Sequence, residues 1–390
     1  SDVMKDSASL ADADLSLDKA VDPSRAQEQA VKWMESQYPA LEFEASAPTL
    51  KVFCPQVVGQ TGEVRVAWQM TVGDIHHSQV KEFVLVDTQT NELLYHYSLI
   101  LGALQRSLVD KDPPLTVYTE QNPPTQQGDA LDAWLDMNDF YDFYENEHGR
   151  DSYDANGGTL VAYINEFIIG CGAVWDSNDT MAKFGSSVLS DDVVGHEFTH
   201  AVTVSSQDGP EPGCNLDYSG ESGAINEALS DMWGEWIDQT NNRGTDTEEV
   251  EWLIGEDWAW DWIIDNCQGG TEGLIAIRSM KNPPLDSNDG IWQGGQPDKW
   301  SDYNSSPPSP ATEVHFNCGI GNKLAYLLTQ TGGVTFNTYT ISGLGISNAA
   351  DLFYECQVHL LTSTSDYHDL GNSLQLAAVN IGLSDSQRYN

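Results

Sequence analysis

The stretch from Val193 to His200 constrains this chain most, because it places two imidazoles four residues apart with a carboxylate between them. On an α-helix, residues at this spacing share one face, so His196 and His200 can direct ring nitrogens at one metal ion, with Glu197 beside it. Such a short pattern also arises by chance in unrelated helices. Here the apolar neighbours recur at helical spacing and predict a mostly buried helix, where unpartnered histidines would be costly. The pattern therefore predicts half of a zinc site.

A second segment, Glu221 to Asp231, offers the third ligand. Glu227 is the candidate, and Asp231 lies four residues later on the same helical face. There it could accept the N–H of a zinc-bound histidine and fix the tautomer of that ring. The alternative is a solvated acidic face, but the apolar neighbours of both residues predict burial, and buried carboxylates need a partner.

With these residues in place, the chain resembles a thermolysin-family zinc metalloendopeptidase. Thr203 and Ser206 stand where the extended metzincin motif needs a glycine and a third histidine, so that family is not matched. The resemblance covers most of the chain from about Asp132 to Ile381 and rests on five ordered blocks: His196 to His200, Gly223 to Asp231, Ile254 to Asp257, Ile277 to Met280, and Val314 to Asn317.

The resemblance implies a role for each matching residue. It makes His196, His200 and Glu227 the zinc ligands and Glu197 the general base that also protonates the leaving amine. The remaining roles are oxyanion stabilisation by Tyr218 and His315, support of the ligands by Asp231 and Asn226, substrate backbone contacts from Arg278 and Ala173, and lining of a pocket by Val193, Ile254, Ile277 and Trp258. That pocket implies cleavage on the amino side of bulky hydrophobic residues, and Trp258 is larger than the usual residue.

Three departures from the family pattern affect the cleft and the metal sites. Gly172 stands where the family has an asparagine that contacts the substrate backbone. Pro310 replaces the aspartate that orients the active-site histidine, and Glu313 is the nearest acid. Leu253 replaces one acid of the paired calcium site. We therefore expect weaker substrate contacts at Gly172 and a different orienting group for His315.

Four acidic residues match the family's paired calcium site: Asp192, Asp238, Glu251 and Glu256. Asp192 lies one turn before His196, and Asp238 lies eleven residues after Glu227, so the two aspartates meet if the helices are antiparallel. An oxygen-rich cluster of this kind suits Ca²⁺, which takes six to eight oxygen ligands in flexible geometry. We expect one or two structural calcium ions.

The charge balance limits the classes of partner. With 17 basic against 60 acidic residues and a net charge of −43, the chain is a poor candidate for binding nucleic acid or anionic membranes. Such a charge repels itself, so added salt should stabilise the protein. A saline habitat would explain the acidity, and so would the general acidity of many secreted proteins.

The N-terminal part differs in character from the rest. Residues Pro23 to Tyr38 form an amphipathic helical pattern, and three later segments read as strands: Leu50 to Val58, Val64 to Val72, and Val80 to Leu101, with a turn at Thr88 to Asn91. This α plus antiparallel β module resembles the propeptide domain of the family, so we expect a proenzyme whose propeptide inhibits it intramolecularly.

The predicted fold class is α+β throughout. A propeptide module spans residues 1–103, followed by a processing region and linker over 104–130. The catalytic part would then have an α+β lobe over 131–240 and a mainly helical lobe over 241–390, with patterns at Ile320 to Thr329 and Ala349 to Leu361. The zinc helix should lie between the two lobes.

The six cysteines and the start of the chain bear on its compartment. Cys171, Cys214 and Cys267 are candidates for disulfides, and Cys318 and Cys356 could pair or stay buried. Cys54 is either a plain strand residue or a thiolate that blocks zinc. The chain starts at Ser1 without an apolar signal segment, so we expect a leader to have been removed.

Secretion, protein or peptide substrates and a monomeric state are implied by the family. A catalytically impaired homologue that uses the same fold for binding is the alternative, although such a protein would have little reason to keep Glu197, Glu227 and Asp231 together.

Overall fold

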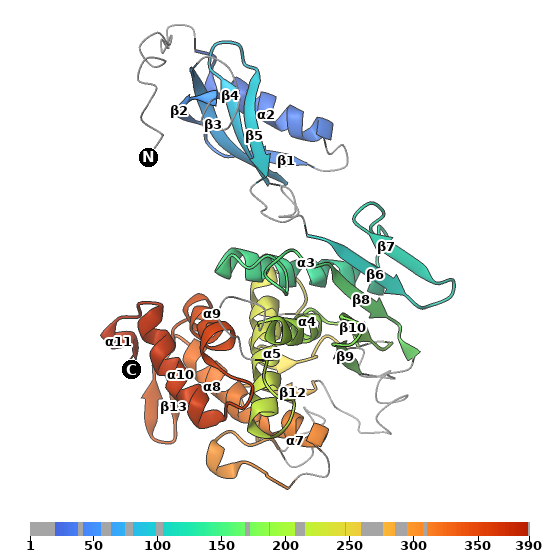
Figure 1. The fold of residues 1–390 in the computed structure, drawn as a ribbon, viewed down its shortest axis with the longest axis vertical. Helices are drawn as coiled ribbons and strands as arrows, with labels where there is room; N and C mark the ends of the chain where they lie inside the picture. Colours follow the sequence, from blue (N-terminus) through green and yellow to red (C-terminus); the bar gives the residue numbers. More distant parts are fainter. Residues whose placement is uncertain are drawn as a thin grey trace. The chain divides into compact units, whose positions relative to one another are not determined.

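The structure is a computed structural model in which the chain forms two compact units, Ser1–Ala103 and Leu104–Asn390 (Figure 1). The described residues are 20–37, 42–55, 64–74, 81–98, 104–167, 172–186, 188–206, 215–245, 247–258, 276–284, 295–306 and 310–388.

The first unit packs one helix, α2 (Pro23–Gln37), on an antiparallel sheet. Ala26, Ala30 and Met34 recur every four residues and are buried in one cluster with Met70 and Val84 of the sheet. The strand order is β1-β3-β4-β5, with β2 also paired to β3. The strands are β1 (Phe43–Ala45), β2 (Thr49–Phe53), β3 (Arg65–Asp74), β4 (Lys81–Asp87) and β5 (Leu93–Ser98).

The turn between β4 and β5 is fixed by Asp87. Its carboxylate accepts hydrogen bonds from the backbone N–H groups of Gln89 at 2.6 Å and Thr90 at 3.0 Å, and Asn91 takes a φ of 61°. The predicted helix and turn are thus present in this unit, and each of the three segments predicted as strands contains strand residues. The short strand β1 was not predicted, because three residues carry too little alternation to be recognised.

The prediction of a linker over 104–130 is wrong. Residues Arg106–Asp110 and Thr116–Thr119 form the strands β6 and β7 of the second unit's sheet. Arg106 is buried, stacks on the Trp134 ring at 4.0 Å and pairs with Glu120 at 2.9 Å, so the hairpin is integral to this unit. The Pro and Gln content that suggested a linker belongs to the turn and to the connection before α3 (Asp129–His148).

The sheet of the second unit has the order β7-β6-β8-β10-β9. The central strands β6, β8 (Leu160–Ile164) and β10 (Met181–Phe184) are parallel, while β9 (Ala173–Asp176) lies at the edge and pairs antiparallel with β10. The edge position of β9 leaves one side of its backbone open. Ala173, predicted to contact substrate, therefore lies on an edge strand.

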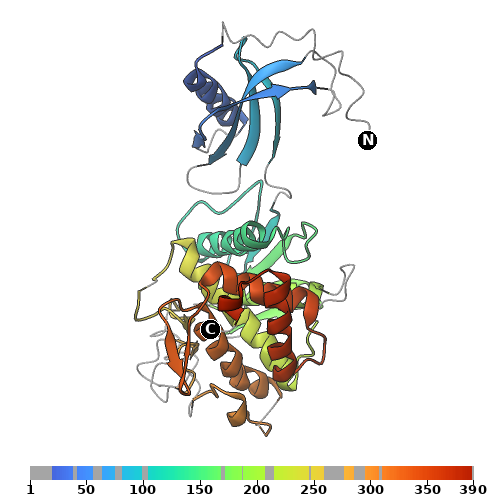
Figure 2. The same ribbon diagram turned by 90° about the vertical axis from the view of Figure 1, so that its left-hand side faces the viewer.

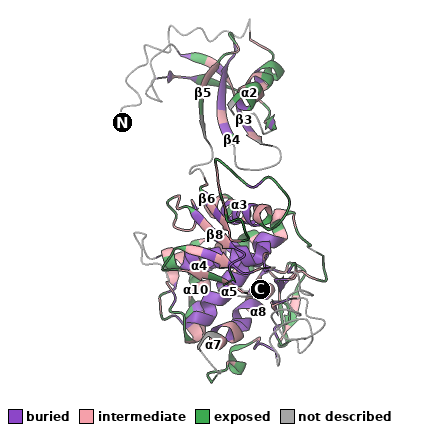
Figure 3. Cartoon of the chain, turned by 90° about the vertical axis from the view of Figure 1, so that its right-hand side faces the viewer, coloured by how far each residue is buried: buried purple, intermediate pink, exposed green. Residues whose placement is uncertain are grey.

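Two long buried helices follow the sheet, α4 (Asp191–Ser205) and α5 (Gly220–Asn241). Glycines allow their close approach, since a Cβ built at Gly195 would lie 3.1 Å from the Cα atom of Gly234. Figure 3 shows buried residues concentrated along these helices and their neighbours. The core beside them contains Trp233, Trp236 and Phe353, all fully buried.

The rest of the second unit is mainly helical (Figure 2). The predicted helices near 320–329 and 349–361 are present, the second ending in a π-helical turn, whereas α10 was not predicted. These elements are β11 (Leu253–Ile254), β12 (Arg278–Ser279), η4 (Trp300–Asp302), α7 (Pro310–Asn317), α8 (Gly319–Thr329), β13 (Val334–Phe336), β14 (Tyr339–Ile341), α9 (Ile346–Glu355), η5 (Cys356–Leu360), α10 (Tyr367–Asn380) and α11 (Asp385–Arg388).

The predicted α+β class is confirmed: a sheet-containing part and a mainly helical part flank the pair α4 and α5. Within the described ranges, no helix combines the length and the apolar character needed to cross a membrane.

Candidate active site

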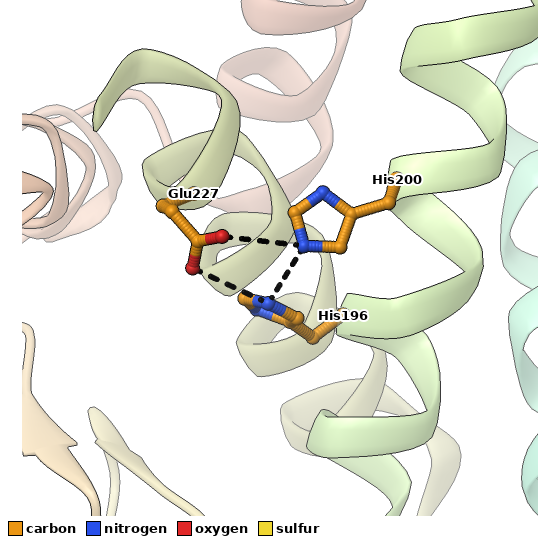
Figure 4. Close-up of side chains that lie close together, drawn as sticks. All are labelled: His196, His200 and Glu227. Carbon is orange, nitrogen blue, oxygen red and sulfur yellow. Dashed lines mark hydrogen bonds and ion pairs between the residues drawn. The ribbon is translucent and has the colours of Figure 1, made fainter. Parts of the chain in front are cut away.

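The predicted zinc ligands come together where α4 faces α5 (Figure 4). His196 and His200 extend from successive turns of α4, and their Nε2 atoms lie 3.1 Å apart. Glu227 extends from α5, with its carboxylate oxygens 3.6 Å from the Nε2 atom of His196 and 3.5 Å from that of His200. The three ligand atoms lie within 4.8 Å of one another, and Glu227 is fully buried.

The far nitrogens of both rings are held by acceptors. The Nδ1 atom of His196 lies 2.8 Å from Oδ1 of Asp231, and the Nδ1 atom of His200 lies 2.8 Å from Oδ1 of Asn226. Each Nδ1 therefore carries the proton and donates it. In neutral rings both Nε2 lone pairs then face the same small volume, which suits a bound cation.

The charges around this volume also favour a cation. One oxygen of Glu227, Oε2, is buried and accepts no hydrogen bond from the described residues. Burial would raise the pKa of Glu227, but the nearby His315, His200, His196 and Arg278 outweigh it and hold the pKa at about 2. Burial lowers the pKa of His200 to about 4. A carboxylate anion and a neutral imidazole are the forms that coordinate zinc.

Glu197 is next to His196 in sequence, but its side chain takes no part in the hydrogen bonds of the three predicted ligands. It is 5% exposed and lines the cleft that contains all three ligands. Burial raises its pKa to about 7, although the backbone N–H of Trp175 on the edge strand donates a hydrogen bond that stabilises the charged form. A carboxylate with a pKa near neutrality suits a group that takes up and returns a proton.

Tyr218 and His315 reach the same cleft from outside the zinc helices. The Tyr218 hydroxyl donates a short hydrogen bond to Oε1 of Glu227 and lies 3.4 Å from Nε2 of His315, which in turn lies 3.3 Å from Oε2 of Glu227. Both side chains are more exposed than the ligands: Tyr218 is 49% exposed and the His315 side chain 33%, against 12% for that of His200. Glu313, the nearest acid in sequence, accepts the Tyr303 hydroxyl at 2.9 Å.

Arg278 is 6% exposed and does not line the cleft, and its Nη2 atom lies 3.8 Å from Oε2 of Glu227. It makes a bidentate pair with Asp231, at 2.7 Å from Nε to Oδ2 and 2.8 Å from Nη2 to Oδ1. Burial alone would raise the pKa of Asp231, but Arg278 and His196 overcome it and keep the carboxylate ionised. Asp231 therefore joins the predicted zinc ligand His196 to the arginine predicted to contact substrate.

The cleft is bounded by the edge strand β9, the segment before α5 and the zinc ligands. Ala173 lines it, in agreement with its predicted position. Val193, Ile254 and Trp258 are buried and do not line this cleft, so their predicted contact with substrate is not seen. Ile277 and Trp258 both lie against Gly255, where a built Cβ would lie 2.9 Å from Ile277 and 3.3 Å from the Trp258 ring.

Carboxylates gather behind the zinc site, on the opposite ends of α4 and α5. Asp192 accepts Ser190 Oγ and the backbone N–H of Gly255, both at 2.5 Å. Burial and the charges of Asp191 and Asp192 raise the pKa of Asp238, and burial and Asp192 raise that of Glu256. Within the described chain, Asp238 Oδ1 and both oxygens of Glu256 are buried without a hydrogen-bond partner.

The sequence predicted four carboxylates of this cluster, but Glu235 and Asp191 were not predicted. Glu235 is fully buried with an unpartnered Oε2 among the described atoms, and the charge of Asp191 raises the pKa of Asp238. Glu251 contributes to the raised pKa of Glu235, so it acts at the edge of the cluster. Glu235 is one turn before the predicted Asp238, a spacing that could have identified it.

Other supporting residues were also missed. Ser230 Oγ lies 3.1 Å from Nδ1 of His200, and Asn322 on α8 donates to Oδ2 of Asp231 at 2.7 Å. Gln296 donates to the backbone oxygen of His315 at 2.6 Å. Ser230 lies inside one of the five matching blocks, but Asn322 and Gln296 belong to other segments, and their contacts depend on tertiary packing.

The expected disulfides are not seen in the part of the chain that the structure describes. Cys171, Cys214 and Cys267 lie outside the described residues. No disulfide joins the described cysteines, Cys54, Cys318 and Cys356. Cys318 and Cys356 are buried, which was one of the two predicted alternatives.

Two histidines and a glutamate from packed helices, with a further buried glutamate beside them, define the kind of site found in zinc hydrolases. Two family models agree with that class. The model described as "Thermolysin metallopeptidase, catalytic domain" matches residues 68–204, and "Thermolysin metallopeptidase, alpha-helical domain" matches residues 214–390. The chain belongs to the thermolysin metallopeptidase family.

Individual relatives agree with this assignment. A "Zinc metalloproteinase" of Renibacterium salmoninarum is 33% identical over 287 residues, which cover 66% of this chain and 47% of that protein. "Thermolysin" of Alicyclobacillus acidocaldarius is 35% identical over 271 residues, covering 67% and 43%. The chain thus spans less than half the length of these curated relatives.

A solved structure shares the fold. It is titled "Precursor of Protealysin, Metalloproteinase from Serratia proteamaculans" and superposes with a TM-score of 0.56 at 23% identity, covering 74% of this chain and 85% of that one.

Proposed function

We propose that this protein is the proenzyme of a zinc-dependent endopeptidase. The observation that carries the proposal is the convergence of the two Nε2 atoms, 3.1 Å apart, on the buried carboxylate of Glu227, with both Nδ1 protons already donated to Asp231 and Asn226. His196, His200 and Glu227 would hold the metal. When bound, zinc supplies a Lewis acid with one coordination position left open for the reaction.

The chain's own groups supply the proton transfers and the charge stabilisation. The carboxylate of Glu197, with its pKa of about 7, takes a proton from the attacking water and returns it to the leaving amine. The Tyr218 hydroxyl and Nε2 of His315, 3.4 Å apart at the edge of the cleft, donate hydrogen bonds to the carbonyl oxygen as it becomes negative. Asn226 and Asp231 hold the ligand rings.

Substrate contact is assigned to the edge strand β9 and to Arg278. The open side of β9 at Ala173 offers backbone groups to an extended peptide, which then lies along the cleft. Arg278 would contact the peptide backbone while it stays paired with Asp231. We retain cleavage before bulky hydrophobic residues, which the family relationship supports. Acidic or basic residues at that position in a digested peptide library would contradict it.

The proposal includes a structural calcium site at Asp192, Asp238 and Glu256, with Glu235 and Glu251 beside it. Buried carboxylate oxygens without hydrogen-bond partners among the described residues are the donor set that Ca²⁺ takes. The unit Ser1–Ala103 is assigned as a propeptide that inhibits the enzyme, and the protein as secreted and monomeric, which the family relationship supports.

The test is metal content together with peptide hydrolysis. The processed protein should hold about one zinc ion and cleave casein, and removal of zinc should abolish cleavage until zinc is returned. Glu227→Gln should lose zinc and activity together. A fully folded protein that binds no zinc would overturn the proposal.

A further inference from the structure

The carboxylate of Asp231 is saturated with hydrogen bonds. Its Oδ1 atom accepts from Nδ1 of His196 and from Nη2 of Arg278, each at 2.8 Å. Its Oδ2 atom accepts from Nε of Arg278 and from Nδ2 of Asn322, each at 2.7 Å. Two nitrogen donors per oxygen, with the weak Cys318 thiol donor at 3.9 Å also on Oδ2, fix the rotation of the carboxylate and with it the direction in which His196 presents Nε2.

Three of these donor atoms belong to His196 and Arg278, and the fourth belongs to a residue of the helical lobe. Asn322 lies on α8, ninety-one residues from Asp231 in sequence, and is fully buried. A Cβ built at Gly321 would lie 2.5 Å from Cβ of Ala228, so α8 lies directly against the turn of α5 that carries the ligand support.

An asparagine at position 322 is not explained by packing, because its buried side chain destabilises the folded state. Its Oδ1 atom is buried and accepts no hydrogen bond from the described part of the chain. An unpaired buried carbonyl destabilises the folded state, and an apolar side chain of similar shape would avoid that cost. What the amide provides is a neutral donor to a carboxylate that already has a full positive charge beside it.

We propose that Asn322 is a positioning residue for zinc, acting through Asp231 on His196. This inference rests on the proposed zinc site and adds a residue of the helical lobe to it. Without the amide, Oδ2 keeps Nε of Arg278 and the weak Cys318 thiol donor at 3.9 Å. The carboxylate can then turn toward Arg278, and its hold on the His196 ring weakens. Zinc affinity should then fall although every ligand remains.

The experiment compares Asn322→Leu with a matched control on the same helix, Thr329→Val. Thr329 is also buried and also bonds α8 to α5, because its hydroxyl accepts Nε1 of Trp236 at 3.2 Å. Zinc dissociation constants are measured by competition with a chelator on the full chain, with urea unfolding in parallel. Asn322→Leu should raise the zinc Kd about 10-fold or more, while Thr329→Val changes it less than about twofold.

A third variant keeps the test decisive if Asn322→Leu does not fold. Asn322→Ser leaves room for a water that can donate to Oδ2, so its zinc Kd should lie between those of wild type and Asn322→Leu. A Kd for either Asn322 variant no higher than that of Thr329→Val would overturn the inference. Failure of the wild-type protein to bind zinc would instead overturn the proposed function, so the two failures are distinguishable.

Discussion

Gly234 sets the distance between the two helices that hold the metal ligands. A Cβ built at this position would lie less than 3.0 Å from the backbone carbonyl oxygen of Asp192, a distance that real Cβ atoms essentially never show. The atom that it meets is backbone, so no side chain can rotate away. Gly234→Ala must therefore push α5 away from α4 in the region between the zinc site and the acidic cluster.

The size of the movement follows from the contact distances. Ordinary van der Waals contact begins at 3.4 Å, so the helices must separate by more than about 0.4 Å, the difference between the two limits. Zinc–ligand distances in proteins normally lie within about 0.2 Å of their usual values. Overpacking of this kind costs about 1–3 kcal/mol. We expect Gly234→Ala to lower the free energy of unfolding by that amount and to weaken zinc binding about 10-fold or more.

Urea unfolding and chelator competition measure the two effects. The matched control is Gly371→Ala in α10, where no described atom lies within 4 Å of the built Cβ. That substitution should stabilise the protein by about 0.5–1 kcal/mol, because alanine loses less backbone entropy in a helix, and should leave zinc affinity unchanged. A Gly234→Ala variant with the same free energy of unfolding and the same zinc affinity as the wild type would refute the reasoning.

Three further predictions concern metals, pH and chemistry. Chelation with EGTA should lower the thermal midpoint, and Asp238→Asn should shrink that decrease because it removes one of the buried like charges; equal decreases would count against calcium at this cluster. Stability should fall as pH drops from 6.5 toward 4, by up to about 3 kcal/mol, because burial lowers the pKa of His148 to about 4 and the unfolded chain takes up the proton first. His148→Phe keeps the stack on Tyr354, 4.1 Å between ring centroids, and should flatten the urea-midpoint profile, whereas an unchanged slope would assign the effect elsewhere. Tyr218→Phe should lower kcat about 100-fold with zinc content unchanged, and wild-type kcat would exclude an oxyanion role.

The sequence predicted the elements whose signals are local. The spacing of His196 and His200 with their apolar neighbours indicated a buried helix, and α4 spans Asp191–Ser205. The same reasoning located α2 and the hairpin of β4 and β5. Periodicity of this kind records which face of an element is buried, and that face is determined within ten or twenty residues.

Features that depend on distant packing could not be predicted. The segment 104–130 has the composition of a linker, yet burial of Arg106 against Trp134 makes it part of the sheet. Asn322 and Gln296 support the site from other segments, through contacts that no local pattern records. Val193 and Ile254 were predicted to line a pocket, but burial and exposure to a cleft cannot be separated by apolar character alone.

The most direct test of the central claim is hydrolysis of casein by the processed wild-type protein and its Glu197→Gln variant, with the zinc content of each determined on the same samples. Both proteins should hold about one zinc ion, since Glu197 is not among the grouped ligands. The wild type should cleave casein, and the variant should be slower by a factor of about 100 to 10,000. Wild-type protein that holds zinc and cleaves no peptide would contradict the account.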